Sequence, residues 1–588
     1  MRPSSSILIA LGLALGLSAF LTTSAAQTDA QDDSSADGPA VAPQRVDVPE
    51  TNVPTLHVTS REIVVDVMVT DANGQPVRGL KQTDFTIEEN GKPQPIRSFR
   101  EYGSEIPVAE PAAVKLPPRV YTNSQSTPAS GPVNILLFDA LHSNSLLSQH
   151  PGSIEISHAL RGAAEYLSAM PPGTKVAIFW LSENGMHMLQ GFTSDRDSLQ
   201  RAVHTNRTDI GADLNGHLID RHTRDWITID ALNQIAAYVS GIKGRKNLLW
   251  LAPGMPVNLM RDGGYGWGSS QMPTRSGGGG SRGGLFGNDT AGPDMGLVHR
   301  LMDVYERFTA EQIAVCPVDT RELQEVPPQT AAIARQSMSH LKMEQVAEDS
   351  GGEAFYNSND LKSEIAKAID DGSQFYTITY IPPKLKEDSR YHHIKVEVTQ
   401  PGLHLVYRQG YNAERVPTLD APAPGPALMK ASMEGKAPIA TQILFDVGVW
   451  PSYLTNPTDA QPQNEPKSKG GKTVRYDIRY GFPPSEIAFT EGADGMLHGS
   501  LEFDSVAYDI NGKRVALLTQ TVTMPLSPAE YDEFVAKRAF QFTQQLDLPL
   551  GQISLHTGVL DNVTSKVGTL EVSVVVRAAN PAQRSAAR

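Results

Sequence analysis

The stretch that decides the fold is Pro132–Leu141, PVNILLFDAL, in which the apolar run Val133–Phe138, interrupted only by Asn134, ends on Asp139. A strand with helices packed over both of its faces has no polar side, so this run predicts a buried strand of a parallel sheet. Open α/β sheets bind their ligands beyond the carboxyl ends of the strands. We therefore expect Asp139 to lie at such a ligand-binding edge.

A short polar loop, His142-Ser143-Asn144-Ser145, comes after Asp139 and precedes an expected helix. Hard divalent cations take oxygen ligands from short polar side chains, so Asp139 and Ser143 are candidate metal ligands. His142, Asn144 and Ser145 are candidate binding residues on the same loop. Asp and Ser also cap helices and close turns, and this structural alternative stays open.

Strand and helix patterns alternate through the middle of the chain. The expected helices are Ser153–Met170, Asp195–Thr205, Arg224–Ser240, Leu297–Phe308, Met343–Gly351 and Leu361–Asp370, and the expected strands are Val133–Phe138, Lys175–Ser182, Leu248–Leu251, Ile313–Val318 and Gln374–Ile381. This alternation predicts a doubly wound, mostly parallel, Rossmann-like sheet with helices on both faces.

Segments with a period of two, typical of antiparallel strands, flank this region on both sides. Asn73-Gly74 and Asn511-Gly512 mark hairpins within them. We expect a small Ig-like β module before the α/β domain and a β-sandwich of about seven strands after it. The predicted organisation is a signal peptide (1–26), a disordered linker (27–55), the β module (56–104), a linker (105–131), the α/β domain (132–411) with a Gly-rich flexible insertion (262–293), a linker (412–430), the C-terminal β-sandwich (431–578) and a disordered tail (579–588).

The composition limits the class of partner. The chain has 588 residues and a formal net charge of −14. Such a charge disfavours nucleic acid and anionic membranes, because phosphates would be repelled.

Cys316 is the single cysteine. Disulfides and thiolate zinc sites are therefore excluded, and the apolar surroundings of Cys316 predict a buried structural thiol.

The first residues have the pattern of an export signal. Arg2 precedes the apolar segment Ile7–Leu21, and the small residues Ser24-Ala25-Ala26 come after it. We expect an exported protein, periplasmic or extracellular. No later apolar run is long enough to cross a bilayer, so no transmembrane segment is expected in the mature chain.

Other polar motifs favour structural readings. The Gly-x-Ser-x-Gly pattern at 279–283 lies inside the Gly-rich insertion rather than between a strand and a helix, where a hydrolase would need it. His217 and His222 are spaced by five residues and do not share one helix face. Arg245-Lys246 and Asp66 are expected to be solvent-facing residues, and Trp250 a core residue.

Six segments, in order along roughly 56–411, carry a resemblance to a known family. They are VDVMVTDANGQPVRGLKQTDFTIEENGKPQPI, NILLFDAL, GIKGRKNLLWLAPGMP, QIAVCPVDTREL, AEDSGGEAFYNSNDL and YHHIKVEVTQPGLHLVYRQGY. These segments resemble exported von Willebrand factor A-related proteins that are abundant in Acidobacteria, and the C-terminal β region is similar to the region after the A-type domain of such proteins. The resemblance implies an A-type (vWA-like) α/β fold.

The resemblance also implies a metal site built from an Asp-x-Ser-x-Ser loop, a distant Thr and a distant Asp. In this chain Asp139 and Ser143 match the loop, Leu141 replaces its middle Ser, and Thr208 stands where the Thr is expected. The distant Asp is replaced by Ala252-Pro253-Gly254. Because Mg²⁺ usually needs one or two carboxylates, the remaining groups imply at most weak binding of Mg²⁺ or Ca²⁺.

Three functions are compatible with these features. The first is a non-enzymatic exported binding or adhesion protein that presents a degenerate vWA-like site to a protein or glycan partner, since no nucleophile and base stand together in the sequence. The second is an extracytoplasmic hydrolase assembled around Asp139, Ser143 and a His of the 217–222 loop. The third is a periplasmic assembly or stress component that acts through its flanking domains.

Overall fold

The structure of the chain is a computed structural model that describes most of the predicted domains. The described residues are 62–103, 116–124, 132–142, 153–205, 220–255, 295–321, 330–382, 391–412, 424–435, 437–452, 473–537 and 539–578. The predicted signal peptide (1–26), linker (27–55), insertion (262–293) and tail (579–588) lie outside these residues. Within them, no helix combines the length and the apolar character needed to span a bilayer.

The α/β domain is built on a five-stranded sheet with the strand order β10-β9-β6-β7-β8. The strands are β6 (Val133–Asp139), β7 (Val176–Ser182), β8 (Gly185–Thr193), β9 (Lys246–Ala252) and β10 (Ile313–Asp319). All pairs are parallel except β7 with the edge strand β8. Every residue of β6, β7, β9 and β10 is buried. The mostly parallel, doubly wound sheet predicted from the apolar runs is therefore confirmed, and β8 is an additional strand.

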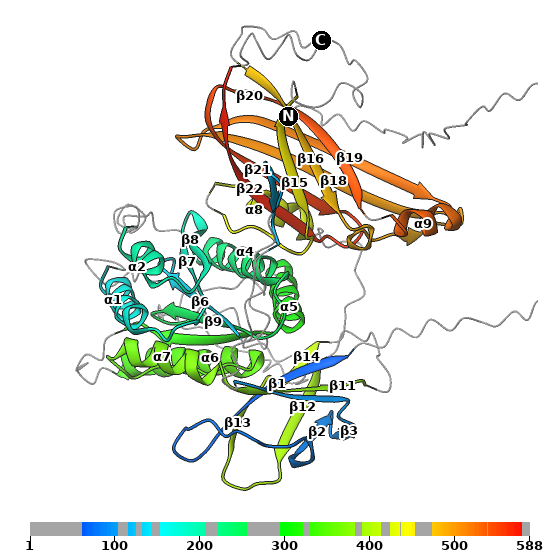
Figure 1. The fold of residues 1–588 in the computed structure, drawn as a ribbon. Helices are drawn as coiled ribbons and strands as arrows, with labels where there is room; N and C mark the ends of the chain where they lie inside the picture. The colour runs from blue at the N-terminus through cyan, green and yellow to red at the C-terminus, as the bar shows by residue number, and fades with distance from the viewer. Residues whose placement is uncertain are drawn as a thin grey trace, which may run out of the picture.

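Helices cover both faces of this sheet (Figure 1). They are α1 (Ser153–Ala169), α2 (Arg196–Thr205), α4 (Arg221–Val239), α5 (Met295–Ala310), α6 (Thr330–Ser350) and α7 (Leu361–Asp371). One core joins alternate strand residues, such as Ile135 and Leu137, to α4, α5 and α6. The other joins the intervening residues, such as Leu136 and Phe138, to α1, α2 and α7. This alternation results from the two-residue period of a strand.

The N-terminal β module draws its strands from both sides of the α/β domain. Its sheets have the orders β13-β1-β11-β4 and β14-β12-β2-β3. The strands are β1 (Ile63–Thr70), β2 (Phe85–Glu89), β3 (Lys92–Gln94), β4 (Ser98–Tyr102), β11 (Phe375–Tyr380), β12 (Tyr391–Val398), β13 (His404–Val406) and β14 (Gly410–Asn412), with a 3-10 turn, η1, at Gln82–Asp84. Their apolar side chains form one shared core.

This arrangement corrects two predicted boundaries. Residues 375–412 complete the β module, whereas the predicted α/β domain extended to 411 and the predicted β module ended at 104. β11 lies between β1 and β4 with antiparallel pairing on both sides. The strands of 62–102 alone would lack partners in both sheets, and their apolar faces would stay uncovered. The module therefore needs residues 375–412.

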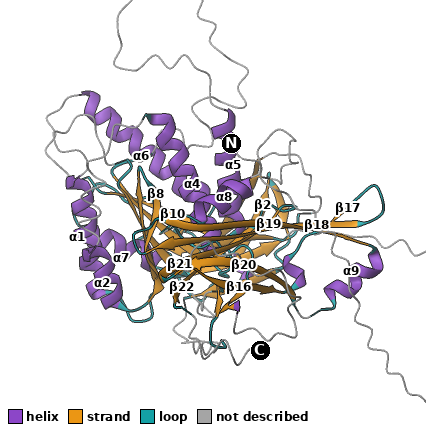
Figure 2. Ribbon diagram, turned by 90° about the horizontal axis from the view of Figure 1, so that it is seen from above, coloured by secondary structure: helices purple, strands orange, loops and turns teal. Residues whose placement is uncertain are grey.

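The C-terminal β-sandwich contains the seven strands expected from sequence and several further elements. Its strands are β15 (Asp446–Pro451), β16 (Thr473–Phe482), β17 (Thr490–Glu491), β18 (Leu497–Asp509), β19 (Arg514–Leu526), β20 (Phe540–Pro549), β21 (Gly551–Asp561) and β22 (Val567–Val576). The helix α9 (Pro528–Val535) and the 3-10 turn η3 (Pro484–Glu486) connect them. The two sheets enclose one large core, and Figure 2 shows the long strands β16 and β18–β22 on edge.

Two segments expected to be linkers take part in this sandwich. β5 (Val120–Thr122), from the predicted linker 105–131, pairs antiparallel with β15. α8 (Pro424–Ser432), from the predicted linker 412–430, packs its Met429 and the following Met433 into a small core between α4 and strands β21 and β22. Composition alone suggested linkers because both segments are rich in Pro and Ala.

The C-terminal sandwich is attached to the end of α4 by hydrogen bonds. The Thr441 hydroxyl donates to the carbonyl oxygens of Ala237 (3.1 Å) and Tyr238 (3.0 Å), and it accepts from the Gly241 amide at 2.9 Å. These carbonyls belong to the last turn of α4, where the helix leaves them without partners. Thr441 thus satisfies the helix end and fixes the domain junction.

Candidate functional site

The carboxyl ends of β6, β9 and β10 form one edge of the parallel sheet, which we call the rim. Ala252 of β9 pairs with Asp319 of β10, and Leu251 pairs with Phe138, so Asp139 and Asp319 stand level on either side of Ala252. Both side chains continue the series of strand positions that face α4, α5 and α6. The strands β7 and β8 lie on one side of β6, and the next strands along the chain, β9 and β10, lie on its other side. The rim is therefore the topological switch point where such sheets bind ligands.

Asp139 is fully buried and its carboxylate is surrounded by donors. Oδ1 accepts from the His142 amide at 2.9 Å. Oδ2 lies 2.8 Å from Nδ1 of His142 and accepts from Nε1 of Trp250 at 2.8 Å. The residue has 0% exposure. Asp139 is thus placed at the ligand-binding end of the sheet, as predicted, but its charge is directed to neighbouring N–H groups of the protein.

The described residues around Asp139 do not fit a cation. N–H groups of His142 and Trp250 face both carboxylate oxygens, which a hard ion would need as its own ligands. Leu141, which replaces the middle Ser of the family loop, is 3% exposed and packs in the core. Ala252 contributes no oxygen where the family has an Asp. Among the described residues there is no group of three His, Cys, Asp or Glu side chains able to hold a metal. Ser143, Asn144, Ser145 and Thr208 lie outside the described residues.

One ring nitrogen of His142 faces a partner, and the other has none among the described residues. Its Nδ1 faces Asp139, and its side chain is 12% exposed. Nε2 is buried and has no hydrogen-bond partner within the described chain. A carboxylate that holds Nδ1 is the arrangement that orients a histidine base. Among the described residues, His142 pairs with Asp139, and His222 accepts a hydrogen bond from Trp226 on α4. His217 lies outside the described residues.

A second carboxylate at the rim was missed by sequence reasoning. The Asp319 carboxylate accepts hydrogen bonds from Nε and Nη2 of Arg321, and it lies 3.1 Å from Nε2 of His340 on α6. The His340 ring stacks on Tyr356, with ring centres 4.2 Å apart. The signal was present in the sequence, since Asp319 ends the apolar run of β10 as Asp139 ends that of β6.

The outer part of this second group is partly open to solvent. The Arg321 side chain is 30% exposed and that of His340 is 12% exposed. The Tyr356 hydroxyl donates to Glu344 of α6, and this hydrogen bond raises the pKa of Tyr356. The rim cluster, defined as Arg321, His340, Glu344 and Tyr356, thus offers a guanidinium, a stacked aromatic pair and a carboxylate next to a buried acid.

Outside the rim, some of the predicted environments agree with the structure and others do not. Cys316 is a buried thiol, as predicted, and burial raises its pKa. Arg245 and Lys246, expected in a solvated turn, are 3% and 2% exposed, and Asp66 is 8% exposed. They are buried because the β module covers the amino ends of β9 and β10. Trp250 is a core residue, as predicted, and in addition holds Asp139.

Comparisons with known proteins give distant structural matches only. No protein-family model matches the chain, and a search of curated proteins finds no relative. Among solved structures, the chain is similar to the manganese-loaded TRAP protein of Plasmodium vivax, at 9% identity and a TM-score of 0.21 over 51% of this chain and 97% of that one. It is similar to a von Willebrand factor type A protein of Catenulispora acidiphila, at 10% identity and a TM-score of 0.23 over 50% of this chain and 68% of that one.

A third match is the pilus adhesin SpaC of Lactobacillus rhamnosus GG, at 10% identity and a TM-score of 0.27. It covers 85% of this chain and 62% of that one, so the chain spans less than two thirds of the adhesin. Identities and scores this low assign neither residues nor partners.

Proposed function

We propose that the chain is a non-enzymatic exported binding protein, periplasmic or extracellular, whose rim recognises a protein or glycan partner without a bound cation. The observation that supports this most strongly is the state of Asp139. Its buried carboxylate accepts N–H groups of His142 and Trp250, so a cation would have to displace them and rebuild its own coordination shell. The cost of breaking buried charge-assisted hydrogen bonds opposes that exchange.

Recognition would then fall to the rim cluster. Arg321, His340 and Tyr356 combine a planar guanidinium with an aromatic stack held in place by Asp319 and Glu344. Tyr and Arg side chains dominate the energy of many binding surfaces because they offer large contact area together with hydrogen bonds. Pre-positioning by the two acids lowers the entropy that such side chains lose on binding.

The proposal is tested by binding of the full mature chain to arrays of envelope glycans and envelope proteins. We expect binding that persists in EDTA and is weakened about tenfold or more by Arg321→Gln. Lys243→Gln is the matched control, because it removes one positive charge from an exposed residue at the opposite end of the sheet. Binding abolished by EDTA, or weakened equally by both variants, would contradict the proposal. Thermal melting of each variant verifies folding.

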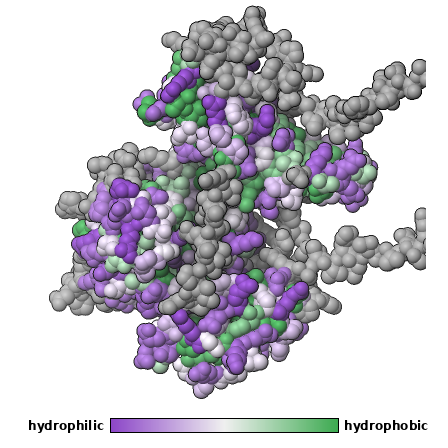
Figure 3. All heavy atoms as spheres, in the orientation of Figure 1, coloured by the Kyte–Doolittle hydropathy of each residue, from purple (hydrophilic) through white to green (hydrophobic). Residues whose placement is uncertain are grey.

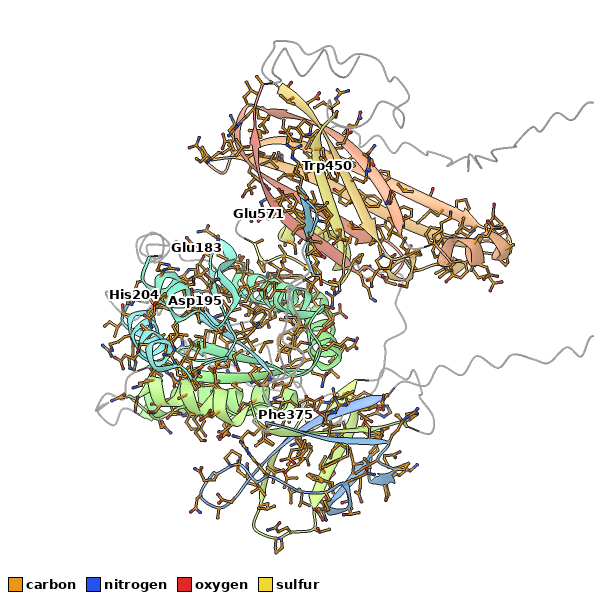
Figure 4. All side chains as sticks on the ribbon, viewed as in Figure 1. Glu183, Asp195, His204, Phe375, Trp450 and Glu571 are labelled. Carbon is orange, nitrogen blue, oxygen red and sulfur yellow. The ribbon has the colours of Figure 1, made fainter. Side chains whose placement is uncertain are left out.

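A hydrolase is the second candidate, and the Asp139–His142 pair is the observation that favours it. A histidine held by a buried acid, whose Nε2 has no partner among the described residues, is suited to general-base chemistry. The test is hydrolysis of a panel of nitrophenyl esters, phosphates and glycosides by the full chain. Turnover that His142→Ala removes, and that His204→Ala on the exposed end of α2 leaves intact (Figure 4), would support the hydrolase and overturn the binding proposal.

A further inference from the structure

A pocket lies where the β module meets the amino ends of β9 and β10, at the end of the sheet opposite the rim. Its volume is about 330 Å³, within the range of small-molecule sites. The β module contributes residues of β1, β4 and β11, and the α/β domain contributes Gly244, Arg245 and Gln312. Figure 4 labels Phe375, one of the lining residues, at this junction.

Two stacked rings in the pocket lining each have a guanidinium beside them. The Arg245 guanidinium lies 5.6 Å from the centre of the Phe375 ring. Phe375 stacks on Tyr102 with ring centres 4.8 Å apart and planes 13° apart. The Arg100 guanidinium lies 5.8 Å from the centre of the Tyr102 ring. Arg100 also donates a hydrogen bond to the Tyr102 hydroxyl at 3.4 Å, so each ring of the stacked pair has one positive group near it.

The pocket carries positive charge without a carboxylate in its lining. Arg100 and Arg245 line it together with the polar side chains of Ser98, Thr377, Thr379 and Gln312, and no acidic residue of the described chain does. Asp66 lies behind this wall, where it accepts from Thr377 (2.6 Å) and Gln312 (3.1 Å). Glu62 accepts from the Thr379 hydroxyl at 2.6 Å.

A neighbouring cavity of about 30 Å³ is lined by groups of both charges, because Asp66 and Asp349 lie in its lining together with two arginines. It shares Val64, Arg245 and Gln312 with the larger pocket and is also lined by Arg408. Arg408 is 9% exposed, and its Nε has no hydrogen-bond partner among the described residues. Burial lowers the pKa of both Arg245 and Arg408. Asp66 and Asp349 thus oppose the two guanidinium groups on the side of this smaller cavity, whereas no acidic residue of the described chain lines the larger pocket beside Arg245. An incoming anion in the larger pocket would offset part of the desolvation cost of Arg245.

We propose that this pocket binds a small organic anion, namely a carboxylate on a planar apolar body. The carboxylate pairs with Arg100, since a guanidinium fork suits a carboxylate geometrically, and Arg245 adds positive charge to the same lining. The planar body packs beside Phe99, Tyr102 and Phe375. Because the pocket and the rim lie at opposite ends of the sheet, this site is independent of partner recognition at the rim.

The probe is benzoate, titrated into the full mature chain and followed by ligand-observed NMR and calorimetry. We expect a Kd near or below about 1 mM, and binding of the neutral analogue benzamide at least about tenfold weaker. Inorganic phosphate is included as a second probe. If phosphate competes with benzoate while benzamide does not, the charge carries the affinity; if benzamide binds as well as benzoate, the proposal is overturned.

Variants locate the binding. Arg100→Gln should weaken benzoate about tenfold, whereas Arg97→Gln, an exposed residue of the same module outside the lining, should leave it unchanged. Ser98→Trp, which fills the pocket from an exposed position, should abolish binding while the melting temperature is kept. Benzoate binding that is absent at millimolar concentration, or that survives both Arg100→Gln and Ser98→Trp, would overturn the proposal.

Discussion

The indole Nε1 of Trp250 donates a 2.8 Å hydrogen bond to Oδ2 of Asp139, from one strand of the parallel sheet to its neighbour. Both residues are almost fully inaccessible, at 2% and 0% exposure. The bond therefore joins the core of the α/β domain to the candidate site. It also directs the acid at the rim inward, toward the protein.

Replacing Trp250 by Phe removes this donor and leaves a buried carboxylate with one partner fewer. We expect a loss of about 1–3 kcal/mol in the free energy of unfolding of the α/β domain. Trp180→Phe is the control, since Trp180 is equally buried and its Nε1 has no hydrogen-bond partner in the described chain. Denaturant titration of both variants checks this. Equal losses would mean that the Trp250 bond adds nothing beyond packing.

Gly352 lies against β10 with no room for a side chain. A Cβ there would lie 2.0 Å from the Val315 carbonyl oxygen and 3.2 Å from Sγ of Cys316. Gly352→Ala should cost at least about 1–3 kcal/mol, because backbone must move to admit the methyl group. Gly481→Ala is the matched control in β16, where a Cβ meets nothing within 4 Å. Comparable stability of the two variants in thermal melts would refute this packing.

The Cys316 thiol should be unreactive in the folded protein. It is buried within β10, and burial raises its pKa, so the nucleophilic thiolate is scarce. We expect an aromatic disulfide reagent to modify Cys316 only after unfolding in denaturant. Rapid modification of the native protein would show that β10 is exposed or that the sheet opens readily.

The two ends of α7 should give opposite pH effects on stability. Burial raises the pKa of Asp371 to about 6, with Lys367 opposing the shift. The folded state thus favours the protonated acid, and stability is lost as the pH rises from the ordinary value of 3.8 through about 6. Asp371→Asn should therefore melt about 2 °C above the natural protein near neutral pH and show little difference at acidic pH.

Asp360 at the start of α7 supplies the control. Its side chain accepts hydrogen bonds from Ser363, which lower its pKa, so its stabilising effect exists above the ordinary pKa and is lost as the pH falls through the lowered value. Asp360→Asn should melt below the natural protein at neutral pH, with a gap that closes in acid. If both variants shift in the same direction at neutral pH, the assigned environments are wrong.

Apolar runs predicted the sheet because a parallel strand that is buried on both faces is apolar at nearly every position. The strand at Val133–Asp139 and its neighbours were found in this way. β8 was missed because Gly185–Thr193 is only half buried and mixes Gly, His and Gln with apolar residues. β11 was found as a strand but placed in the wrong sheet, since its local pattern does not report that β1 and β4 are its partners.

The candidate site was predicted in position but not in detail. The apolar run predicted that Asp139 lies at the rim. The residues that hydrogen-bond to it, His142 and Trp250, come from a loop and from a neighbouring strand. The second acid, Asp319, meets Arg321 two residues later and His340 on α6. Such contacts depend on tertiary packing, as does the burial of Arg245 beneath the β module. Figure 3 shows that much of the surface in view is hydrophilic.

Calorimetric titration of Mg²⁺, Ca²⁺ and Mn²⁺ into the full mature chain tests most directly whether the inward-facing Asp139 excludes a cation. We predict no binding tighter than about 1 mM for any of the three ions. Micromolar binding that disappears in Asp139→Asn, and persists in Asp319→Asn, would contradict it.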